Sequence, residues 1–242
     1  MQLDRVLTSL ESISPWAERR LHRIRRLMTS VDSMSPRGQR KWRRIRRLIP
    51  HRLRWFYEGN PRIRGQMWYA ERKLLYKTIR KYQPDVVCES GTWMGGGSTL
   101  FIAQALHDNG HGVLHTTEIS PEFHHSAQEN YRRHLRHLLP HVQFHLGDST
   151  DIYAELLPSL QRVDVLLLDG AEDAEQTWRE FTLFEPFLSP DAILMTHDWN
   201  TDKMARVRPH LTSAVEWRLE RILNPPYSLG MAVSRRASSH HL

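Results

Sequence analysis

The segment at residues 89–99, ESGTWMGGGST, constrains the fold of this chain more than any other. It holds four glycines, three of them consecutive, between a short β-branched stretch at residues 85–88 and apolar residues at helical spacing over residues 98–107. This pattern predicts a strand, a glycine turn and a helix. Because glycine lets a ligand lie against bare amides at a helix N-terminus, we expect the turn to contact a ligand. Glycine needed for packing alone is the alternative.

The charges around the turn narrow the choice of ligand. A P-loop carries a lysine after its glycines to meet phosphate oxygens, and this turn contains neither Lys nor Arg. The dinucleotide fingerprint GxGxxG is also absent, and Glu89 would repel a pyrophosphate. A carboxylate attracts an amine and a sulfonium instead, so the turn predicts S-adenosylmethionine as the cofactor. The predicted contacts in this segment are Glu89, Gly91, Gly95, Gly97 and Ser98.

The net charge of +7 belongs to an N-terminal arm. Residues 1–54 hold 15 Lys or Arg and four acids, a balance of +11, which leaves residues 55–242 with a balance of −4. A mildly acidic domain argues against a broad nucleic-acid track on its own surface. The single cysteine, Cys88, excludes a disulfide framework, and no apolar run reaches the roughly 20 residues that span a bilayer. We expect a cytoplasmic protein without a secretion signal.

The arm contains an internal duplication. SISPWAERRLHRIRRLM at residues 12–28 aligns with SMSPRGQRKWRRIRRLI at residues 33–49, at an offset of 21 residues. Each copy opens with Ser-Pro, a plausible start for a helix, and places apolar residues on one helical stripe with arginines on the other faces. We predict two basic helices or a helical hairpin. Three roles stay open: a cap on the domain, peripheral contact with an anionic membrane, and docking of RNA or another acidic partner.

After the arm, strand patterns alternate with helix patterns. A linker and a leading helix, residues 66–82, occupy residues 55–84, and the main domain follows at residues 85–242. The predicted strands are residues 85–88, 112–119, 142–146, 163–168 and 192–196, and the predicted helices are residues 98–107, 121–139, 152–160 and 174–188. A strand hairpin, residues 215–223 and 228–235, ends the chain. We predict an α/β fold with a doubly wound, mostly parallel sheet and one antiparallel strand at its end.

Acidic residues recur where the predicted strands end. Five of them fall at or just beyond a strand end: Glu89, Glu118, Asp148, Asp169 and Asp198. Ligands of such sheets bind outside the carboxyl ends of the strands, so we expect these acids in one site. Glu118 lies 21 residues after Gly97, which predicts binding of both ribose hydroxyls, and Asp148 and Ser149 are placed to bind the adenine edge. The alternative for each acid is a cap on the next helix.

Together these motifs resemble the class I S-adenosylmethionine-dependent methyltransferases over about residues 66–236. The shared series is Glu-x-Gly with trailing glycines, an acid after the second strand, Gly-Asp-Ser after the third, Leu-Asp-Gly after the fourth, and a terminal hairpin. Within that class, ESGTWMGGGST and LLLDG followed by HD are similar to the small-molecule O-methyltransferases of the catechol and macrocin type. The resemblance implies a seven-stranded Rossmann-like sheet. It also implies methyl transfer to a hydroxyl of a sugar, polyketide or lipid-linked glycan.

The resemblance further implies catalytic and metal-binding candidates. Many members hold a divalent cation such as Mg²⁺ with carboxylates after the fourth and fifth strands, which here are Asp169 and Asp198, with Asn200 as a further oxygen ligand. Asp169 also belongs to the predicted cofactor contacts. Many members carry a histidine three residues after the first of these carboxylates, where this chain has Glu172. The predicted general base is therefore Glu172 or His197.

Two other functions compete with this prediction. An RNA methyltransferase docked through the arm is disfavoured, because Asp-Gly-Ala-Glu at residues 169–172 replaces the N/D-P-P-Y/F tetrad that is used to methylate a flipped base amine. The Asn-Pro-Pro-Tyr at residues 224–227 lies in the terminal hairpin and predicts a turn. A non-catalytic cofactor-binding scaffold is favoured only by the missing histidine. The sequence decides neither the acceptor nor the oligomeric state, and a homo-oligomer is one of the states considered.

A truncated chain that starts at Trp55 is expected to fold and to bind S-adenosylmethionine like the full chain, because the charge and the repeat of the arm are separable from the sheet. Thermal unfolding and calorimetry of both chains measure this. Aggregation or loss of cofactor binding in the truncated chain would instead make the arm part of the domain core.

Overall fold

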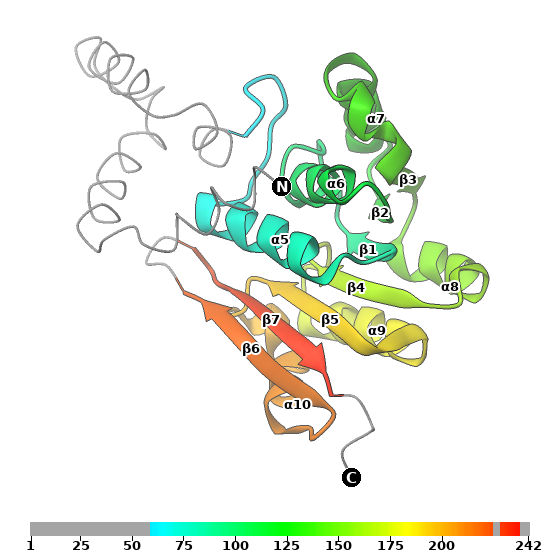
Figure 1. Cartoon of the computed structure of the whole chain (residues 1–242). Helices are drawn as coiled ribbons and strands as arrows, with labels where there is room; N and C mark the ends of the chain where they lie inside the picture. The colour runs from blue at the N-terminus through cyan, green and yellow to red at the C-terminus, as the bar shows by residue number, and fades with distance from the viewer. Residues whose placement is uncertain (1–58, 225–227, 238–242) are drawn as a thin grey trace, which may run out of the picture. The chain divides into compact units, whose positions relative to one another are not determined.

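The computed structural model of the chain describes residues 59–224 and 228–237. The predicted helices of the basic arm lie outside these residues, so the cap, membrane and RNA roles of the arm stay predictions. The centre of the fold is a seven-stranded sheet with the order β3-β2-β1-β4-β5-β7-β6 (Figure 1). Its strands are β1 (Val86–Ser90), β2 (Val113–Glu118), β3 (Val142–Leu146), β4 (Val163–Leu168), β5 (Leu188–His197), β6 (Trp217–Leu223) and β7 (Met231–Arg236).

Helices alternate with the strands along the chain. Within residues 59–224 and 228–237, the α-helices are α5 (Tyr69–Tyr82), α6 (Ser98–Asn109), α7 (Pro121–His134), α8 (Ser149–Leu160), α9 (Ala174–Phe184) and α10 (Val207–Ser213). The short 3₁₀ helices of the same residues are η2 (Arg136–His141), η3 (Glu185–Phe187) and η4 (Asp202–Met204). This alternation confirms the predicted doubly wound α/β fold with seven strands. Among the residues that the structure describes, no helix is both long and apolar enough to cross a bilayer.

The first five strands are parallel, and their order reverses beside β1. β1 pairs with β2 on one side and with β4 on the other. The chain builds outward from β1 to β3 and then crosses back to β4, so the reversal lies between β1 and β4. Open α/β sheets bind ligands at such a reversal, outside the carboxyl ends of the strands. In this chain that place is next to Ser90 and Leu168, where β1 and β4 end.

The antiparallel strand of the terminal hairpin occupies a different position in the sheet from the predicted one. The antiparallel strand is β7, but it lies between β5 and β6, and β6 forms the edge. The physical reason is visible in the two strands. β7 begins with the buried apolar run Met231-Ala232-Val233, whereas β6 alternates apolar and charged side chains and is half exposed, as an edge strand can be. The prediction of an antiparallel strand at the end of the sheet was therefore wrong by one position.

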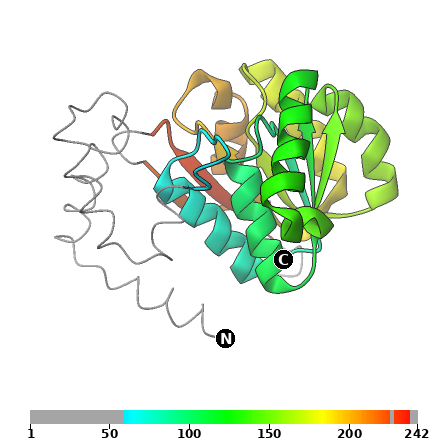
Figure 2. The same ribbon diagram turned by 90° about the horizontal axis from the view of Figure 1, so that it is seen from above.

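The sheet is covered on both faces (Figures 1 and 2). α5 and α6 pack against each other on one face. The side chains that they bury almost completely include Leu75, Ile79, Leu100 and Phe101. On the other face, side chains of α8, α9 and α10 form a core cluster with the strands. Its aromatic members are Tyr153, Phe181, Phe184, Trp199 and Trp217.

Three predicted helix bounds were wrong for local reasons. The helix predicted over residues 121–139 ends at His134 and continues as η2, which contains Pro140 and turns the chain so that Leu138 is buried. The helix predicted over residues 174–188 ends at Phe184 and continues as the 3₁₀ helix η3, whose proline has no N–H to donate to the carbonyl four residues earlier. α8 starts three residues earlier than predicted, because the Asp148 side chain caps it at Thr150 N, 2.8 Å away.

The chain before α5 crosses directly over the glycine turn. A Cβ on Gly65 would lie 2.1 Å from the carbonyl oxygen of Gly96, and a Cβ on Gly96 would lie 2.3 Å from that of Arg64. Two glycines therefore let two backbone segments touch. Part of the glycine turn serves packing, as the alternative interpretation held, and Gly65 is a partner that the sequence pattern did not indicate.

Substitution of Gly65 or Gly96 by alanine is expected to lower the free energy of unfolding by about 3 kcal/mol or more, because backbone atoms cannot yield to a Cβ as a flexible side chain can. Gly110→Ala is the matched control. Gly110 has a φ of +83° but no atom within 4 Å of its Cβ position, so only the cost of the left-handed conformation remains, about 1 to 2 kcal/mol. Denaturant unfolding of the three variants measures the difference, and equal losses would contradict the close approach.

Candidate active site

A cavity of about 950 Å³ opens at the carboxyl ends of the parallel strands. Each of the first five strands supplies a residue that lines the cavity at or just after its end. In chain order these residues are Ser90, Glu118, Gly147, Asp169 and His197. Residues 66–68, ahead of α5, and Leu229, ahead of β7, complete the wall. The sheet therefore brings together residues that are far apart in the sequence, as parallel strands of this topology must.

The floor of the cavity is held by one serine and one buried glutamate. The Ser90 hydroxyl donates to Glu180 Oε2 at 3.1 Å and accepts from the backbone amides of Asp169 and Gly170, at 3.3 and 3.2 Å. Glu180 also accepts from the hydroxyl of Ser149. Burial raises the pKa of Glu180, against hydrogen bonds from the two serines that lower it. This network ties the ends of β1 and β4 to the start of α8.

The glycine turn divides its predicted contacts between the cavity and the core. Gly91, Gly97 and Ser98 line the cavity. Gly95 does not, and its Cβ position lies 2.9 Å from the ring of Tyr131 in α7. Glu89 also stays outside the cavity wall and is fully buried beneath the turn.

Glu89 supports the turn from below. Its Oε2 accepts from the hydroxyls of Thr99 and Thr116, both at 2.7 Å. Burial raises the pKa of Glu89 to about 7, although hydrogen bonds from Ser98, Thr99 and Thr116 act to lower it. These contacts give Glu89 a structural role, so the direct ligand contact expected from the sequence has no support in its position.

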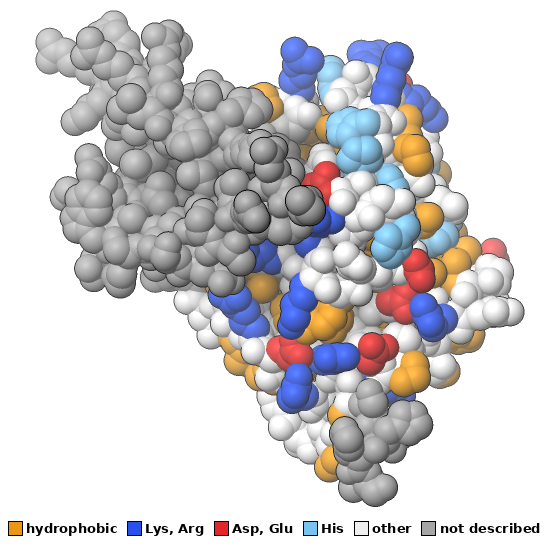
Figure 3. Space-filling model, in the orientation of Figure 1, with side chains coloured by type: hydrophobic (Ala, Val, Ile, Leu, Met, Phe, Trp, Pro, Cys, Tyr) orange, Lys and Arg blue, Asp and Glu red, His pale blue; other side chains and the backbone are white. Residues whose placement is uncertain are grey.

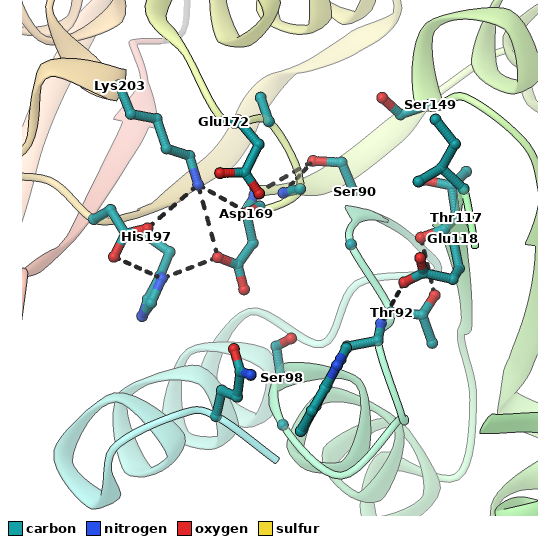
Figure 4. Close-up of a pocket in the computed structure, with 18 of the residues that line it drawn as sticks. Ser90, Thr92, Ser98, Thr117, Glu118, Ser149, Asp169, Glu172, His197 and Lys203 are labelled. Carbon is teal, nitrogen blue, oxygen red and sulfur yellow. Dashed lines mark hydrogen bonds and ion pairs between the residues drawn. The ribbon is translucent and has the colours of Figure 1, made fainter. Parts of the chain in front are cut away.

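One end of the cavity is built around Glu118. Its carboxylate accepts from the backbone amides of Trp93, at 2.7 Å, and Ser120, at 2.9 Å. Asp148 and Ser149 line the same end, where Figure 4 shows Ser149 close to Glu118. The hydrogen bond from the Thr150 hydroxyl lowers the pKa of Asp148. Asp148 is thus both a helix cap and a cavity residue, so the two interpretations of this acid do not exclude each other.

The other end of the cavity contains a histidine surrounded by carboxylates (Figure 4). His197 Nδ1 lies 2.9 Å from Asp169 Oδ1 and 3.2 Å from Asp198 Oδ1, and Nε2 lies 3.5 Å from Glu71 Oε2. Burial alone would lower the pKa of His197, but the three carboxylates, Asp169 foremost, outweigh it and raise the pKa to about 12. An imidazolium has no lone pair to accept a proton. The structure therefore argues against His197 as a general base.

Lys203 completes this cluster and was not indicated by the sequence. Its Nζ donates to the backbone carbonyl of Asp169 at 2.8 Å and lies 3.5 Å from Asp198 Oδ2 and 3.9 Å from Asp169 Oδ1. The Lys203 side chain is 7% exposed. Burial alone would raise the pKa of Asp198, but His197 and Lys203 lower it.

The residues predicted as metal ligands and as a general base do not all lie together. Asp169, His197 and Asp198 each offer one ligand atom, and these atoms lie within 4.8 Å of one another. No other group of His, Cys, Asp and Glu in the described part of the chain meets that spacing. Asn200 is not brought to the cluster, because its amide donates to Asn224 Oδ1 at 2.9 Å. Glu172 lines the cavity and is exposed there.

Lys203 and Glu71 illustrate why some site residues were missed. Lys203 lies in the short 3₁₀ helix η4, after β5, where the sequence shows neither an apolar period nor a strand end. Glu71 lies in the first turn of α5 and is fully buried, and it accepts from Trp68 N at 2.8 Å. A charged residue near a helix N-terminus predicts a solvated cap. Only the packing of α5 beside β5 turns it into a partner of His197.

Many of the histidines fall between residues 107 and 145, and Figure 3 shows several His side chains near one another on one face of the molecule. The ring of His107 lies 5.2 Å from that of His137 and 5.5 Å from that of His141, measured between centroids. His115 stacks on His145. None of them belongs to the one group with metal-ligand spacing in residues 59–224 and 228–237, and His115 is buried within β2.

Comparisons with known proteins agree with the fold and with the position of the site at the carboxyl ends of the strands. Residues 88–199, from β1 to the residues after β5, match the family model described as a methyltransferase domain. A search of curated proteins found no match. The matched segment contains every strand end that opens into the cavity, from Ser90 to His197. Over this segment the chain therefore matches a methyltransferase domain, in agreement with the resemblance that the motifs indicated.

Solved structures share this fold at low sequence identity. The O-methyltransferase TomG from Streptomyces achromogenes, which is involved in tomaymycin synthesis, is 17% identical, with a TM-score of 0.59 over 78% of this chain and 91% of that one. A putative O-methyltransferase from Klebsiella pneumoniae is 18% identical, with a TM-score of 0.62 over 80% and 94%. The O-methyltransferase from Bacillus cereus, solved with S-adenosylhomocysteine, is 14% identical, with a TM-score of 0.62 over 86% and 96%.

The charge on His197 should make its contribution to stability depend on pH. The folded pKa of about 12 lies above the ordinary value of 6.5, so this contribution is complete below pH 6.5 and is lost as the pH rises toward 12. The difference in unfolding free energy between the wild type and His197→Gln should therefore shrink from pH 7 to pH 9, by at most about 1.4 kcal/mol per pH unit. Denaturant unfolding at both pH values measures it.

His115→Gln is the matched control for this measurement. Burial, together with His145, lowers the pKa of His115 to about 4, so that histidine is neutral in both the folded and the unfolded state above pH 7. The stability difference for His115→Gln should stay constant from pH 7 to pH 9. A constant difference for His197→Gln as well would contradict the charged state of His197.

Proposed function

We propose that this chain transfers a methyl group from S-adenosylmethionine to a hydroxyl of a small molecule. The observation that carries the proposal is the single cavity that joins Glu118 at one end to Asp169 and Glu172 at the other, across the glycine turn. Its position at the strand reversal, the match to a methyltransferase domain and the O-methyltransferases among the similar structures all support it.

The residues present fit the cofactor. Gly91 and Gly97 leave backbone open to the cavity, and Gly91 has a φ of +93° that a side chain would strain. The Glu118 carboxylate has two oxygens, each with one amide contact, and a carboxylate can accept further bonds from ribose hydroxyls. The exposed side chain of Ile119 offers an apolar surface to a base. When bound, S-adenosylmethionine supplies a methyl group that its sulfonium has already activated.

The acceptor belongs at the opposite end. Met67, Trp68 and Leu229 give that wall apolar surface, and Asp169, Glu172 and Lys203 give it polar groups. A sugar, a polyketide or a lipid-linked glycan combines an apolar face with hydroxyls and suits such a wall. The volume of about 950 Å³ is near the upper end of typical ligand sites, which accommodates a cofactor and a small acceptor together.

Glu172 is the better candidate for the general base. The acceptor hydroxyl must lose its proton while its oxygen is aligned with the methyl group. Both nitrogens of His197 already face carboxylates, whereas the Glu172 carboxylate is exposed in the cavity and can accept a proton and release it to water. The role of His197 is then to hold Asp169 and Asp198 in place.

Glu118→Ala is expected to weaken S-adenosylmethionine binding at least about tenfold, because charge-assisted hydrogen bonds contribute about 1.5 to 3 kcal/mol each. Glu122→Ala is the control, since Glu122 is an exposed glutamate in the first turn of α7 and does not line the cavity. Calorimetry on the wild type and both variants measures the affinities, with circular dichroism to confirm folding. Unchanged affinity in a folded Glu118→Ala variant would contradict the ribose contact.

Methyl transfer itself is tested by release of S-adenosylhomocysteine in the presence of panels of sugars, polyketides and glycolipids. Turnover with one hydroxylated panel, and none with the matching methyl ethers, would support O-methylation. Binding of the cofactor without turnover on any panel, together with turnover on RNA, would overturn the small-molecule proposal.

A further inference from the structure

Lys203 lies beside Asp169 and Asp198, the carboxylates after β4 and β5 for which the sequence predicted a divalent cation. Its Nζ lies 3.5 Å from Asp198 and 3.9 Å from Asp169, and it donates to the Asp169 carbonyl at 2.8 Å. Figure 4 shows Lys203 reaching toward His197 and Asp169 beside Glu172. Both carboxylates therefore already face a cationic side chain that belongs to the chain itself.

The ligand set does not fit a resident Mg²⁺ ion. Such an ion demands near-octahedral oxygen ligands at about 2.0 to 2.1 Å. Here an imidazole lies against both carboxylates, with Nδ1 at 2.9 Å from Asp169 and 3.2 Å from Asp198. The third predicted oxygen ligand, Asn200, is bound to Asn224 instead. An ion could enter only by displacing the Lys203 ammonium and the imidazole edge.

The burial of Lys203 shows that this arrangement is built into the fold. The side chain is 7% exposed, and its neighbour Met204 is fully buried, so η4 is anchored in the core. A buried ammonium is costly unless it is paired, and the Asp169 carbonyl and Asp198 satisfy it. The 3.9 Å contact to Asp169 Oδ1 is too long for a hydrogen bond, so among the described residues one N–H of the ammonium remains for a ligand in the cavity.

We propose that Lys203 replaces the divalent cation at this site, so that the acceptor hydroxyl binds at Lys203 Nζ and no metal is required. This inference rests on the proposed function. A fixed positive charge beside the hydroxyl stabilises the developing oxyanion, which is the task that a metal performs in a metal-dependent site. Asp169 and Asp198 then serve to position the ammonium.

Mn²⁺ binding to the full chain, saturated with S-adenosylhomocysteine, tests the inference by electron paramagnetic resonance. The wild type is expected to leave Mn²⁺ free. Lys203→Met, which keeps the length of the side chain and removes its charge, is expected to bind Mn²⁺ at least about tenfold more tightly, because the carboxylates lose their cationic partner. The double variant Lys203→Met with Asp198→Asn should lose that binding.

Lys81→Met is the matched control. Lys81 also pairs with a carboxylate, Glu220 at 3.9 Å, but its side chain is 67% exposed and does not line the cavity. It should leave Mn²⁺ binding as weak as in the wild type. Stoichiometric Mn²⁺ binding by the wild type that Asp198→Asn abolishes would overturn the proposal, and so would the absence of binding in a folded Lys203→Met variant. If Lys203→Met does not fold, the wild-type titration decides alone.

The readouts separate this inference from the proposed function. Failure of the wild type to bind S-adenosylhomocysteine would contradict the proposed function. Mn²⁺ binding by a wild type that does bind S-adenosylhomocysteine would contradict only the role of Lys203. Once an acceptor is known, turnover should be unchanged by a chelator. At least a tenfold loss of turnover on addition of chelator would also overturn the proposal.

Discussion

The ion pairs at the carboxyl edge of the sheet are the interaction on which the site depends. Asp169 follows β4, Asp198 follows β5, and Glu71 comes from α5, and all three face His197. Glu71 is fully buried and the other three side chains are half-buried, so each charge is stabilised mainly by its oppositely charged neighbours. These ion pairs therefore hold β4, β5, α5 and η4 at fixed distances from one another. They also fix the end of the cavity at which the acceptor is proposed to bind.

Close backbone approach is the second constraint, and it comes from glycine. Gly91 and Gly170 lie against each other, since a Cβ on Gly91 would be 2.8 Å from the Cα of Gly170. This contact closes the floor beneath the reversal between β1 and β4, where Ser90 and Glu180 add hydrogen bonds. Gly65 and Gly96 act in the same way above the turn. The glycines thus serve the shape of the cavity as much as contact with a ligand.

The two ends of the cavity differ in how their charges are compensated, and this difference divides the proposed roles. At Glu118, backbone amides satisfy the carboxylate and leave lone pairs for neutral hydroxyl donors. At Asp169 and Asp198, the carboxylates face the cationic side chains of His197 and Lys203, and the Lys203 ammonium is the group proposed to stabilise an oxyanion. The proposals of ribose binding at the first end and acceptor binding at the second rest on that contrast. Each role can be tested without disturbing the other.

The local sequence pattern was enough to predict the alternation of strands and helices and the glycine turn. It also placed Glu118, Asp148 and Asp169 at strand ends, because a strand end is a property of neighbouring residues. Pattern could not decide contacts between elements. Glu89 has the spacing of a ligand contact but is buried under the turn, and Asn200 lies two residues after Asp198 but turns toward Asn224. The order of β6 and β7, the burial of Glu71 and the position of Lys203 also depend on which segments pack together. The sequence by itself determined the fold class and the edge of the sheet that holds the site, whereas the packing of distant segments decided which charges meet there.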